Sequence, residues 1–379
     1  MIRNLKRYLS DPFLKRMYKE IRQAGSIKSI SVDLTHECNI RCTGCYYFSE
    51  GMDSAKSPID EEHFDLFIKK ELDRGTNFIT VVGGEPSLQL GRLRKLHENF
   101  RINVSTNGLI KIPYAGFESM PIGVSIWGDH ATDRTMRGGG NVNIFRTALK
   151  NYKDDTRAFW YYTVAPGRAD EIERVVEQCI ENGNNVLFNY YSDMLGIGGE
   201  LDYRGGFRDV REEINRMIRL YPDKILMSSY LSEVVTTGEL YGQKWGHEVC
   251  TSVSVNHEAN SERIKNGNPY NPHFRAYNAD LESTRRCCTG INRSCDSCLD
   301  TWEHYSWIIL NMKKHLSSKR EFTNWLSTMY LFYLINRLVD FDEGMKLLPE
   351  IHYRLGNGGF RKSVRKEEQK HPVMIAQGV

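Results

Sequence analysis

The sequence predicts an α/β protein, in which a parallel sheet is covered by helices. Short apolar runs rich in β-branched residues alternate with longer amphipathic runs about six times between residues 27 and 230, and this alternation is typical of β/α units. Turn-like segments carrying cysteine, glycine, serine and asparagine follow several of the predicted strands, where chemistry in α/β folds usually sits. The chain has 379 residues, of which 40% are hydrophobic, so it can build a sizeable core.

Composition excludes several classes of function. The net charge is +3, so no global field favours nucleic acid, and we expect no nucleic-acid partner. No apolar run approaches the roughly 18 residues of a membrane span, and the N-terminus shows no signal-peptide core. Nine cysteines fall mostly in metal-like clusters, which indicates a reducing compartment and a cytoplasmic protein.

Residues 1–26 form the first predicted segment, a basic amphipathic helix in which Pro12 starts a second piece. Packing on the outside of the sheet is the favoured interpretation. A membrane-surface helix, suited to a lipid substrate, is the alternative.

The first strand, within residues 27–34, leads into a loop with a C-x3-C-x2-C pattern made by Cys38, Cys42 and Cys45. Three thiolates this close suit three corners of an iron–sulfur cube, which leaves one iron without a protein ligand. A zinc site would need a fourth ligand, and neither His36 nor Glu37 stands at a familiar zinc spacing.

Three further strands end in polar or glycine-rich turns. Residues 78–82 end in Gly83-Gly84-Glu85-Pro86, where two glycines allow close backbone approach to a ligand. Residues 101–105 run into Thr106-Asn107-Gly108, and residues 121–127 include Ser125. A helix between residues 58 and 72, with Asp60 as its N-cap, separates the first two strands.

Two aromatic strands complete the sheet, at residues 157–164 and 185–190, with a helix at 170–181 between them. That helix carries Cys179 on its apolar face, which indicates a core position. In these strands the sequence does not show which of the alternating side chains face the interior. The residues that we expect at the mouth of the sheet are Tyr162, Asn189 and Tyr191.

A second cysteine group follows the sheet region. It comprises Cys250, the adjacent pair Cys287 and Cys288, and the C-x2-C pair Cys295 and Cys298. Four of these five thiols would complete either a second iron–sulfur centre or a zinc site. Residues 301–350 then read as aromatic helices that cap the sheet.

Together, the first cysteine loop and the Gly-Gly-Glu-Pro turn one β/α unit later resemble those of the radical S-adenosylmethionine (radical SAM) enzymes. In that family the open iron of a [4Fe-4S] cluster chelates S-adenosylmethionine, whose reductive cleavage yields a 5′-deoxyadenosyl radical. The resemblance implies a partial (β/α)6 barrel of TIM type. It gives cofactor-binding roles to Tyr46, Gly83, Gly84, Glu85, Ser105, Asn107, Ser125 and Asn189, with Tyr47 as the alternative to Tyr46 for stacking on the adenine. Catalytic candidates are Ser125, Arg137, Tyr162 and Tyr191, with Arg137 binding a substrate anion or lying solvated in its loop.

The placement of the second cysteine group resembles the SPASM and twitch extensions, which carry an auxiliary [4Fe-4S] cluster. We expect the ligands Cys250, Cys288, Cys295 and Cys298, with Cys287 as the alternative to Cys288. The layout is also similar to adenosylhopane-synthase-like proteins, which share Gly44 before the third cysteine. The expected division is residues 1–26 as the basic helix, 27–240 as the barrel, 241–300 as the auxiliary region, and 301–379 as the helical cap and charged tail.

The resemblance implies a radical oxidoreductase or lyase that takes hydrogen from a substrate. A small molecule such as a sugar or aminocyclitol is the favoured substrate, with oxidation, epimerisation or elimination as the reaction. A lipid or peptide substrate is the alternative, and a zinc-bearing binding protein is the alternative from another class. A flavodoxin- or ferredoxin-type electron donor is the expected partner.

Overall fold

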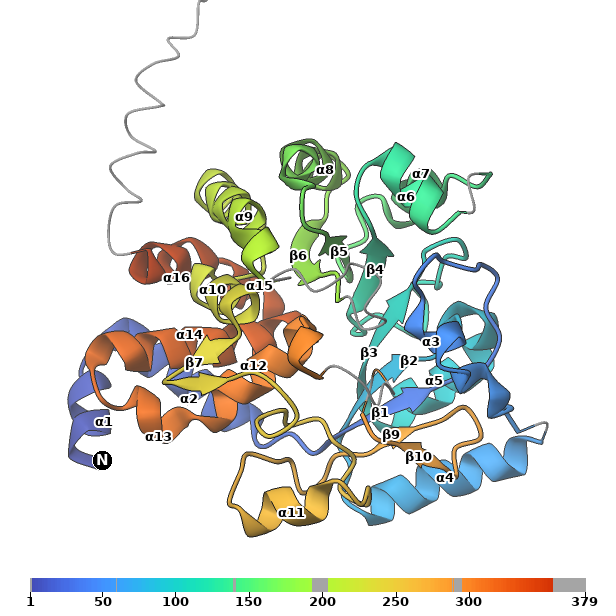
Figure 1. Cartoon of the computed structure of the whole chain (residues 1–379), viewed down its shortest axis with the longest axis horizontal. Helices are drawn as coiled ribbons and strands as arrows, with labels where there is room; N and C mark the ends of the chain where they lie inside the picture. The colour runs from blue at the N-terminus through green and yellow to red at the C-terminus, as the bar shows by residue number, and fades with distance from the viewer. Residues whose placement is uncertain are drawn as a thin grey trace, which may run out of the picture.

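The computed structural model describes residues 2–58, 60–138, 141–192, 204–287, 289 and 295–356. Its centre is a mostly parallel sheet in which the first six strands lie side by side in chain order, as Figure 1 shows. The predicted α/β class is therefore confirmed. These strands are β1 (Ser29–Asp33), β2 (Phe78–Val82), β3 (Arg101–Thr106), β4 (Ile122–Ile126), β5 (Ala158–Val164) and β6 (Asn185–Tyr190).

Helices between successive strands form an arc around the outside of the sheet (Figure 1). Asp60 caps the first of them as predicted, because its carboxylate accepts a hydrogen bond from the amide of His63 at 2.8 Å. The arc consists of α4 (Glu61–Asp73), α5 (Leu90–Asn99), α6 (His130–Met136), α7 (Ile144–Tyr152), α8 (Ala169–Glu181) and α9 (Arg208–Leu220).

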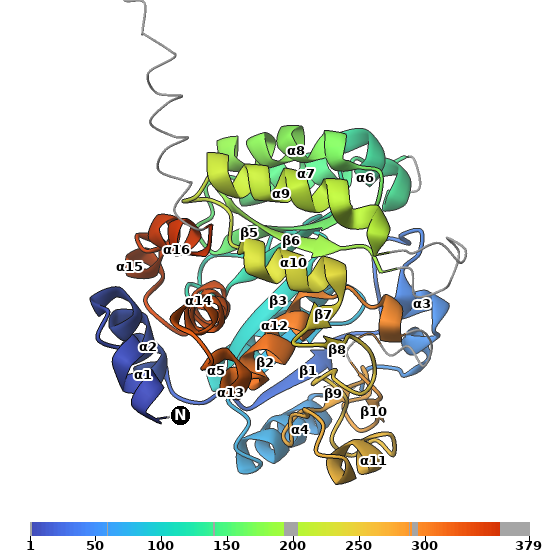
Figure 2. The same cartoon turned by 60° about the vertical axis from the view of Figure 1, so that its left-hand side comes forward.

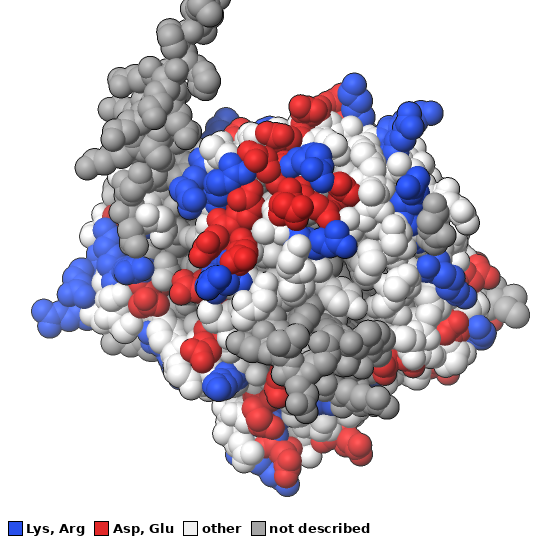
Figure 3. All heavy atoms as spheres, turned by 45° about the horizontal axis from the view of Figure 1, so that its top comes forward, with Lys and Arg blue, Asp and Glu red and all other residues white. Residues whose placement is uncertain are grey.

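The face formed by the outer helices carries mixed charge. Figure 3 shows acidic and basic side chains intermingled there, with no broad basic field on that face. Between α8 and α9, for example, Arg216 forms ion pairs with both Glu173 and Glu213. Charges of both signs therefore neutralise one another over this part of the surface.

The cysteine-rich region extends the sheet, which the sequence did not predict. Strand β9 (Ala276–Tyr277) pairs in parallel with β1, and β10 (Thr284–Arg285) pairs antiparallel with β9. The Arg285 guanidinium donates to both carboxylate oxygens of Asp33 in β1, at 2.7 and 2.8 Å, in a buried ion pair. Strand β7 (Glu239–Leu240) precedes this region and pairs with β8 (Gln243–Lys244), and the region also contains α11 (Asn260–Lys265).

C-terminal helices close the open side of the sheet. In both Figure 1 and Figure 2, α14 (Lys319–Ile335) lies between the strands and the N-terminal helices. Helix α12 (Thr301–Leu310) is fixed to β6 because the Thr301 hydroxyl donates to the carbonyl of Phe188 at 3.0 Å. The remaining helices of this layer are α10 (Ser229–Thr237), α13 (Met312–His315), α15 (Phe341–Met345) and α16 (Leu348–Leu355).

The predicted N-terminal helix is two helices, α1 (Ile2–Tyr8) and α2 (Pro12–Ala24), and the second begins at Pro12 as expected. Leu14, Met17 and Ile21 of α2 are buried, and α2 packs against α14. Its apolar face is thus occupied by the protein itself. Nowhere in the described ranges does a helix combine the length and apolarity needed to cross a membrane.

His352 gives the stability of this helical layer a pH dependence. The ring is buried, its Nε2 donates to the carbonyl of Ile225 at 2.9 Å, and burial lowers its pKa from 6.5 to about 4. The unfolded chain takes up a proton below pH 6.5, whereas the folded chain does not until about pH 4. Stability from this group is therefore lost as pH falls through that window.

We expect His352→Gln, measured by urea unfolding at pH 7.5 and 5.0, to lose about 2 kcal/mol less stability on acidification than the unsubstituted chain. An equal acid loss in both proteins would contradict this assignment.

Candidate functional site

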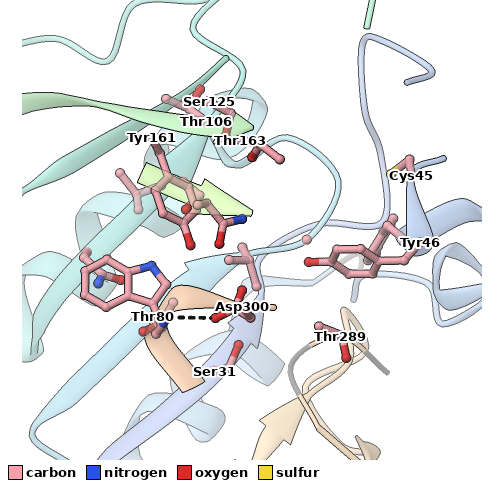
Figure 4. A pocket seen from close by; sticks show the side chains of 18 of the residues that line it. Ser31, Cys45, Tyr46, Thr80, Thr106, Ser125, Tyr161, Thr163, Thr289 and Asp300 are labelled. Atoms are coloured by element: carbon pink, nitrogen blue, oxygen red, sulfur yellow. Dashed lines mark hydrogen bonds between the residues drawn. The ribbon is translucent and has the colours of Figure 1, made fainter. Parts of the chain in front are cut away.

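A pocket of about 350 Å3 runs from the cysteine loop into the interior of the sheet. Each of the six parallel strands contributes lining residues, and α12 and α14 contribute the opposite wall. Figure 4 shows Cys45 and Tyr46 at one end of this space, with Tyr161, Thr80, Ser31 and Asp300 toward the other. The pocket is therefore a lumen enclosed by the curved sheet and its helical cap.

Cys38, Cys42 and Cys45 all line this pocket, and none forms a disulfide. Burial raises the pKa of Cys42 to about 11 and also raises that of Cys38, because it disfavours the charged thiolate. Among the residues that the structure describes, no three His, Cys, Asp or Glu side chains are gathered in the arrangement of a metal site. The loop thus brings the three thiols to one cavity.

Gly83 and Gly84 let the turn after β2 press against the cysteine loop. The amides of Gly84 and Glu85 donate to the carbonyls of Thr35 and Glu37, each at 2.8 Å. A Cβ on Gly84 would lie 1.9 Å from the Glu37 carbonyl oxygen, and Gly83 has a φ of +115°. Only glycine fits at these two positions.

The Glu85 carboxylate is buried and engaged by the protein. It accepts hydrogen bonds from the Thr106 hydroxyl at 2.6 Å, from the Asn107 amide at 2.7 Å and from the Ser87 amide at 3.0 Å. Glu85 therefore joins the turn after β2 to the end of β3 while lining the pocket.

Most of the other predicted site residues also reach the pocket. Asn107 bridges to the cysteine loop by donating to the side chain of Asn39 at 2.7 Å, and Tyr191 packs edge-on against Trp127. The predicted residues that line the pocket in addition to the cysteines, Gly83, Gly84 and Glu85 are Tyr46, Ser105, Asn107, Ser125, Arg137, Asn189 and Tyr191.

Tyr162 is the exception and requires a correction. Its side chain is 1% exposed and packs on Phe188 in the core, away from the pocket. Because successive side chains of a strand point to opposite faces, the neighbours Tyr161 and Thr163 face the lumen instead. The aromatic run had no polar alternation from which the register could be read.

Arg137 is buried rather than solvated. Its guanidinium pairs with Asp133 at 3.0 Å and donates to the carbonyl of Ser125 at 2.5 Å. Its charge also acts on Cys42, opposing the increase in pKa that burial of that thiol causes. Arg137 therefore supplies positive charge beside the first cysteine group.

The described part of the second cysteine group comprises Cys250, Cys287, Cys295 and Cys298, whereas Cys288 lies outside the described residues. Burial raises the pKa of Cys250, Cys295 and Cys298, and the nearby Cys287 raises each of them further. Arg286 donates to the Cys295 sulfur at 3.3 Å. These four cysteines therefore lie close enough to influence one another, and the described alternative, Cys287, is among them.

A row of polar side chains in the lumen escaped the sequence prediction. The strand register aligns Ser31 of β1 with Thr80 of β2, and Thr80 with Asn103 of β3. All three line the pocket. Single polar residues between apolar neighbours were the available signal, because a polar residue in a buried strand must face either a cavity or a partner.

The wall opposite this row comes from α12, which was predicted only as part of a cap. Asp300, Trp302 and Glu303 line the pocket there. Asp300 also caps the helix, because its carboxylate accepts hydrogen bonds from the amides of Trp302 and Glu303. Sequence spacing alone cannot place this helix against β6.

Comparison with known proteins supports the iron–sulfur interpretation of the first cysteine loop. Residues 30–120, which include the loop and the Gly-Gly-Glu-Pro turn, match a family model described as a 4Fe-4S single cluster domain. A probable GTP 3′,8-cyclase from Sulfurisphaera tokodaii is 22% identical over 226 residues, covering 55% of this chain and 69% of that protein.

The sporulation killing factor maturation protein SkfB from Bacillus subtilis is 28% identical over 206 residues, covering 51% of this chain but only 48% of its own length. Among solved structures, that of anSMEcpe with bound AdoMet covers 87% of this chain and 98% of its own, with 17% identity and a TM-score of 0.50. That likeness concerns the fold.

We expect Gly84→Ala to destabilise the protein by about 2 kcal/mol or more, because its Cβ would force the turn after β2 and the cysteine loop apart. Urea unfolding measures this loss. Gly91→Ala in α5 is the matched control. Its Cβ would meet nothing within 4 Å, so it should be neutral or stabilising by up to about 1 kcal/mol. Equal stability of the two variants would contradict the tight contact.

Proposed function

We propose that this chain, which belongs to the radical SAM superfamily and carries a SPASM-like cysteine-rich region, is an enzyme that removes hydrogen from a substrate held in the lumen of its sheet. The single observation that supports this most is the placement of Cys38, Cys42 and Cys45 at the mouth of one pocket with the Gly83–Gly84 turn.

The residues at the mouth fit the proposed cofactors chemically. Three soft sulfur donors from one loop suit iron and leave one iron open. The turn at Gly83 and Gly84 offers backbone rather than side chains to a ligand. When bound, a [4Fe-4S] cluster and S-adenosylmethionine would supply radical chemistry that no side chain can provide.

The protein's part in this proposal is binding and exclusion of water. Ser105 and Asn107 present a hydroxyl and an amide at the end of β3, suited to the hydroxyls of a ribose. Tyr46 offers an aromatic surface at the pocket mouth, where an adenine ring could stack. The helical cap covers the far end, so the substrate C–H would react in a sheltered space.

For the second cysteine group we propose an auxiliary [4Fe-4S] cluster held by Cys250, Cys295, Cys298 and either Cys287 or Cys288. Cys287 acts electrostatically on each of the other three thiols, which supports its membership of this group, whereas Cys288 lies outside the described residues. A structural zinc ion held by the same thiols is the competing occupant.

The substrate that we propose is a small molecule rather than a nucleoside triphosphate such as the one in the cyclase relatives' name. Among the described lining residues Arg137 is the only Lys or Arg, and it is already paired with Asp133. A triphosphate would need several cations or a bound metal there. A peptide that inserts one side chain is the alternative, and the proposed partner is a flavodoxin- or ferredoxin-type electron donor.

Two cysteine variants test the proposal in anaerobically purified and reconstituted protein. We expect Cys42→Ala to abolish dithionite-dependent release of 5′-deoxyadenosine and to lower iron and sulfide by about four atoms each per chain. Cys298→Ala should lower iron and sulfide by a similar amount while sparing that release.

Cys179→Ala is the control, because Cys179 is buried in α8 outside both cysteine groups and should keep full iron and activity. A colourless protein with stoichiometric zinc and no S-adenosylmethionine turnover would overturn the radical function. A full iron content in Cys298→Ala would contradict only the proposed auxiliary cluster.

A further inference from the structure

The deep end of the pocket is lined by hydrogen-bond acceptors from two facing walls. Asp300 and Glu303 of α12 form one wall, and Ser31, Thr80 and Asn103 belong to the other. Figure 4 shows the Asp300 side chain in the cavity near Ser31 and Thr80. Asp300 is held there by its own capping bonds at the start of α12, so the carboxylate is positioned before any ligand arrives.

The charges of the described pocket lining are unbalanced. Three carboxylates line the pocket, those of Glu85, Asp300 and Glu303, against the single guanidinium of Arg137. Arg137 is paired with Asp133 beside the cysteine loop, and Glu85 is held by three protein hydrogen bonds. The other two lining carboxylates, those of Asp300 and Glu303, lie together at the α12 end.

Two polar atoms in the opposite wall have no hydrogen-bond partner in the structure. One is the Oγ of Ser31, a residue that is 2% exposed, and the other is the Oδ1 of Asn103, which is 7% exposed. The amide nitrogen of Asn103 is already used, because it donates to the side chain of Asn336 at 2.7 Å. Leaving a buried polar atom unsatisfied costs about 1–3 kcal/mol, so a donor arriving from the cavity would be stabilised.

We propose, building on the radical function above, that this acceptor-rich end binds a primary ammonium group of the substrate between Asp300 and Glu303 on one side and Ser31 and Asn103 on the other. An ammonium carries three donors and a positive charge, which match both the excess of acceptors and the excess of carboxylates. Trp302 and Phe332 line the same pocket and give the carbon skeleton an apolar surface.

A neutral polyol matches this end less well. Its hydroxyls would satisfy Ser31 and Asn103 but would bring no positive charge to the two carboxylates of this wall. An anionic ligand would be repelled by them. The ammonium could belong to a free small amine or to a lysine side chain, and both sources present the same chemistry to this wall.

Two matched probe pairs distinguish the sources. Cyclohexylamine is compared with cyclohexanol, and Nα-acetyl-lysine amide with Nα-acetyl-norleucine amide, by isothermal titration of the reconstituted protein in the presence of S-adenosylmethionine and without reductant. We expect at least one amine to bind about tenfold or more tighter than its neutral counterpart, as a charge-assisted contact provides. The pair that shows the larger ratio identifies the source.

Asp300→Asn should reduce the ratio of amine affinity to neutral-probe affinity about tenfold. It should keep the helix cap, because asparagine also caps helices well. Glu303→Gln should reduce the ratio independently of any effect on the cap. Asp340→Asn is the matched control, since Asp340 caps α15 by accepting from the Glu343 amide at 2.9 Å and does not line the pocket. The control should keep the full ratio.

Equal affinity for charged and neutral probes in both pairs, or an unchanged ratio in both pocket variants, would overturn the ammonium subsite. Iron content and S-adenosylmethionine binding are measured on the same samples. If the protein holds iron and cofactor but binds charged and neutral probes equally, only the ammonium subsite is contradicted. If the protein lacks iron but still binds the amines more tightly, the subsite is supported and the radical function is contradicted.

Discussion

The site depends on the contact of two backbones, where the turn after β2 lies against the cysteine loop after β1. Parallel pairing brings the carboxyl ends of these strands together, and the amides of Gly84 and Glu85 then bind the carbonyls of Thr35 and Glu37. The contact leaves no room for a Cβ at Gly84. Because the cysteine loop has little regular structure of its own, this contact fixes where its thiols enter the pocket.

The same constraint explains why the mouth of the site was predictable from the sequence. Its residues come from turns that directly follow strands, and parallel strands in chain order must place such turns at one edge. Cysteine spacing, the paired glycines and the polar ends of β3 and β4 are all local signals. Even the N-cap at Asp60 and the break at Pro12 follow from local chemistry.

The deep end of the pocket was not predictable because it depends on contacts between distant parts of the chain. Asn103 meets Asn336 across more than two hundred residues, and α12 reaches β6 through Thr301. No spacing of residues in the sequence indicates either of these contacts. The error at Tyr162 has a different cause, since a strand that is aromatic throughout gives no alternation to tell its two faces apart.

The second cysteine group is joined to the Asp300 wall of the pocket through one short segment. Cys298 belongs to the second cysteine group, and Asp300, two residues later, is the N-cap of α12. Between them the amide of Leu299 donates to the Ser192 hydroxyl at 2.8 Å, and the amide of Thr301 donates to Asn189 at 3.1 Å. The carboxylate is therefore positioned by the same segment that carries the thiol. An occupant that orders the second cysteine group would therefore also bear on the position of the Asp300 carboxylate.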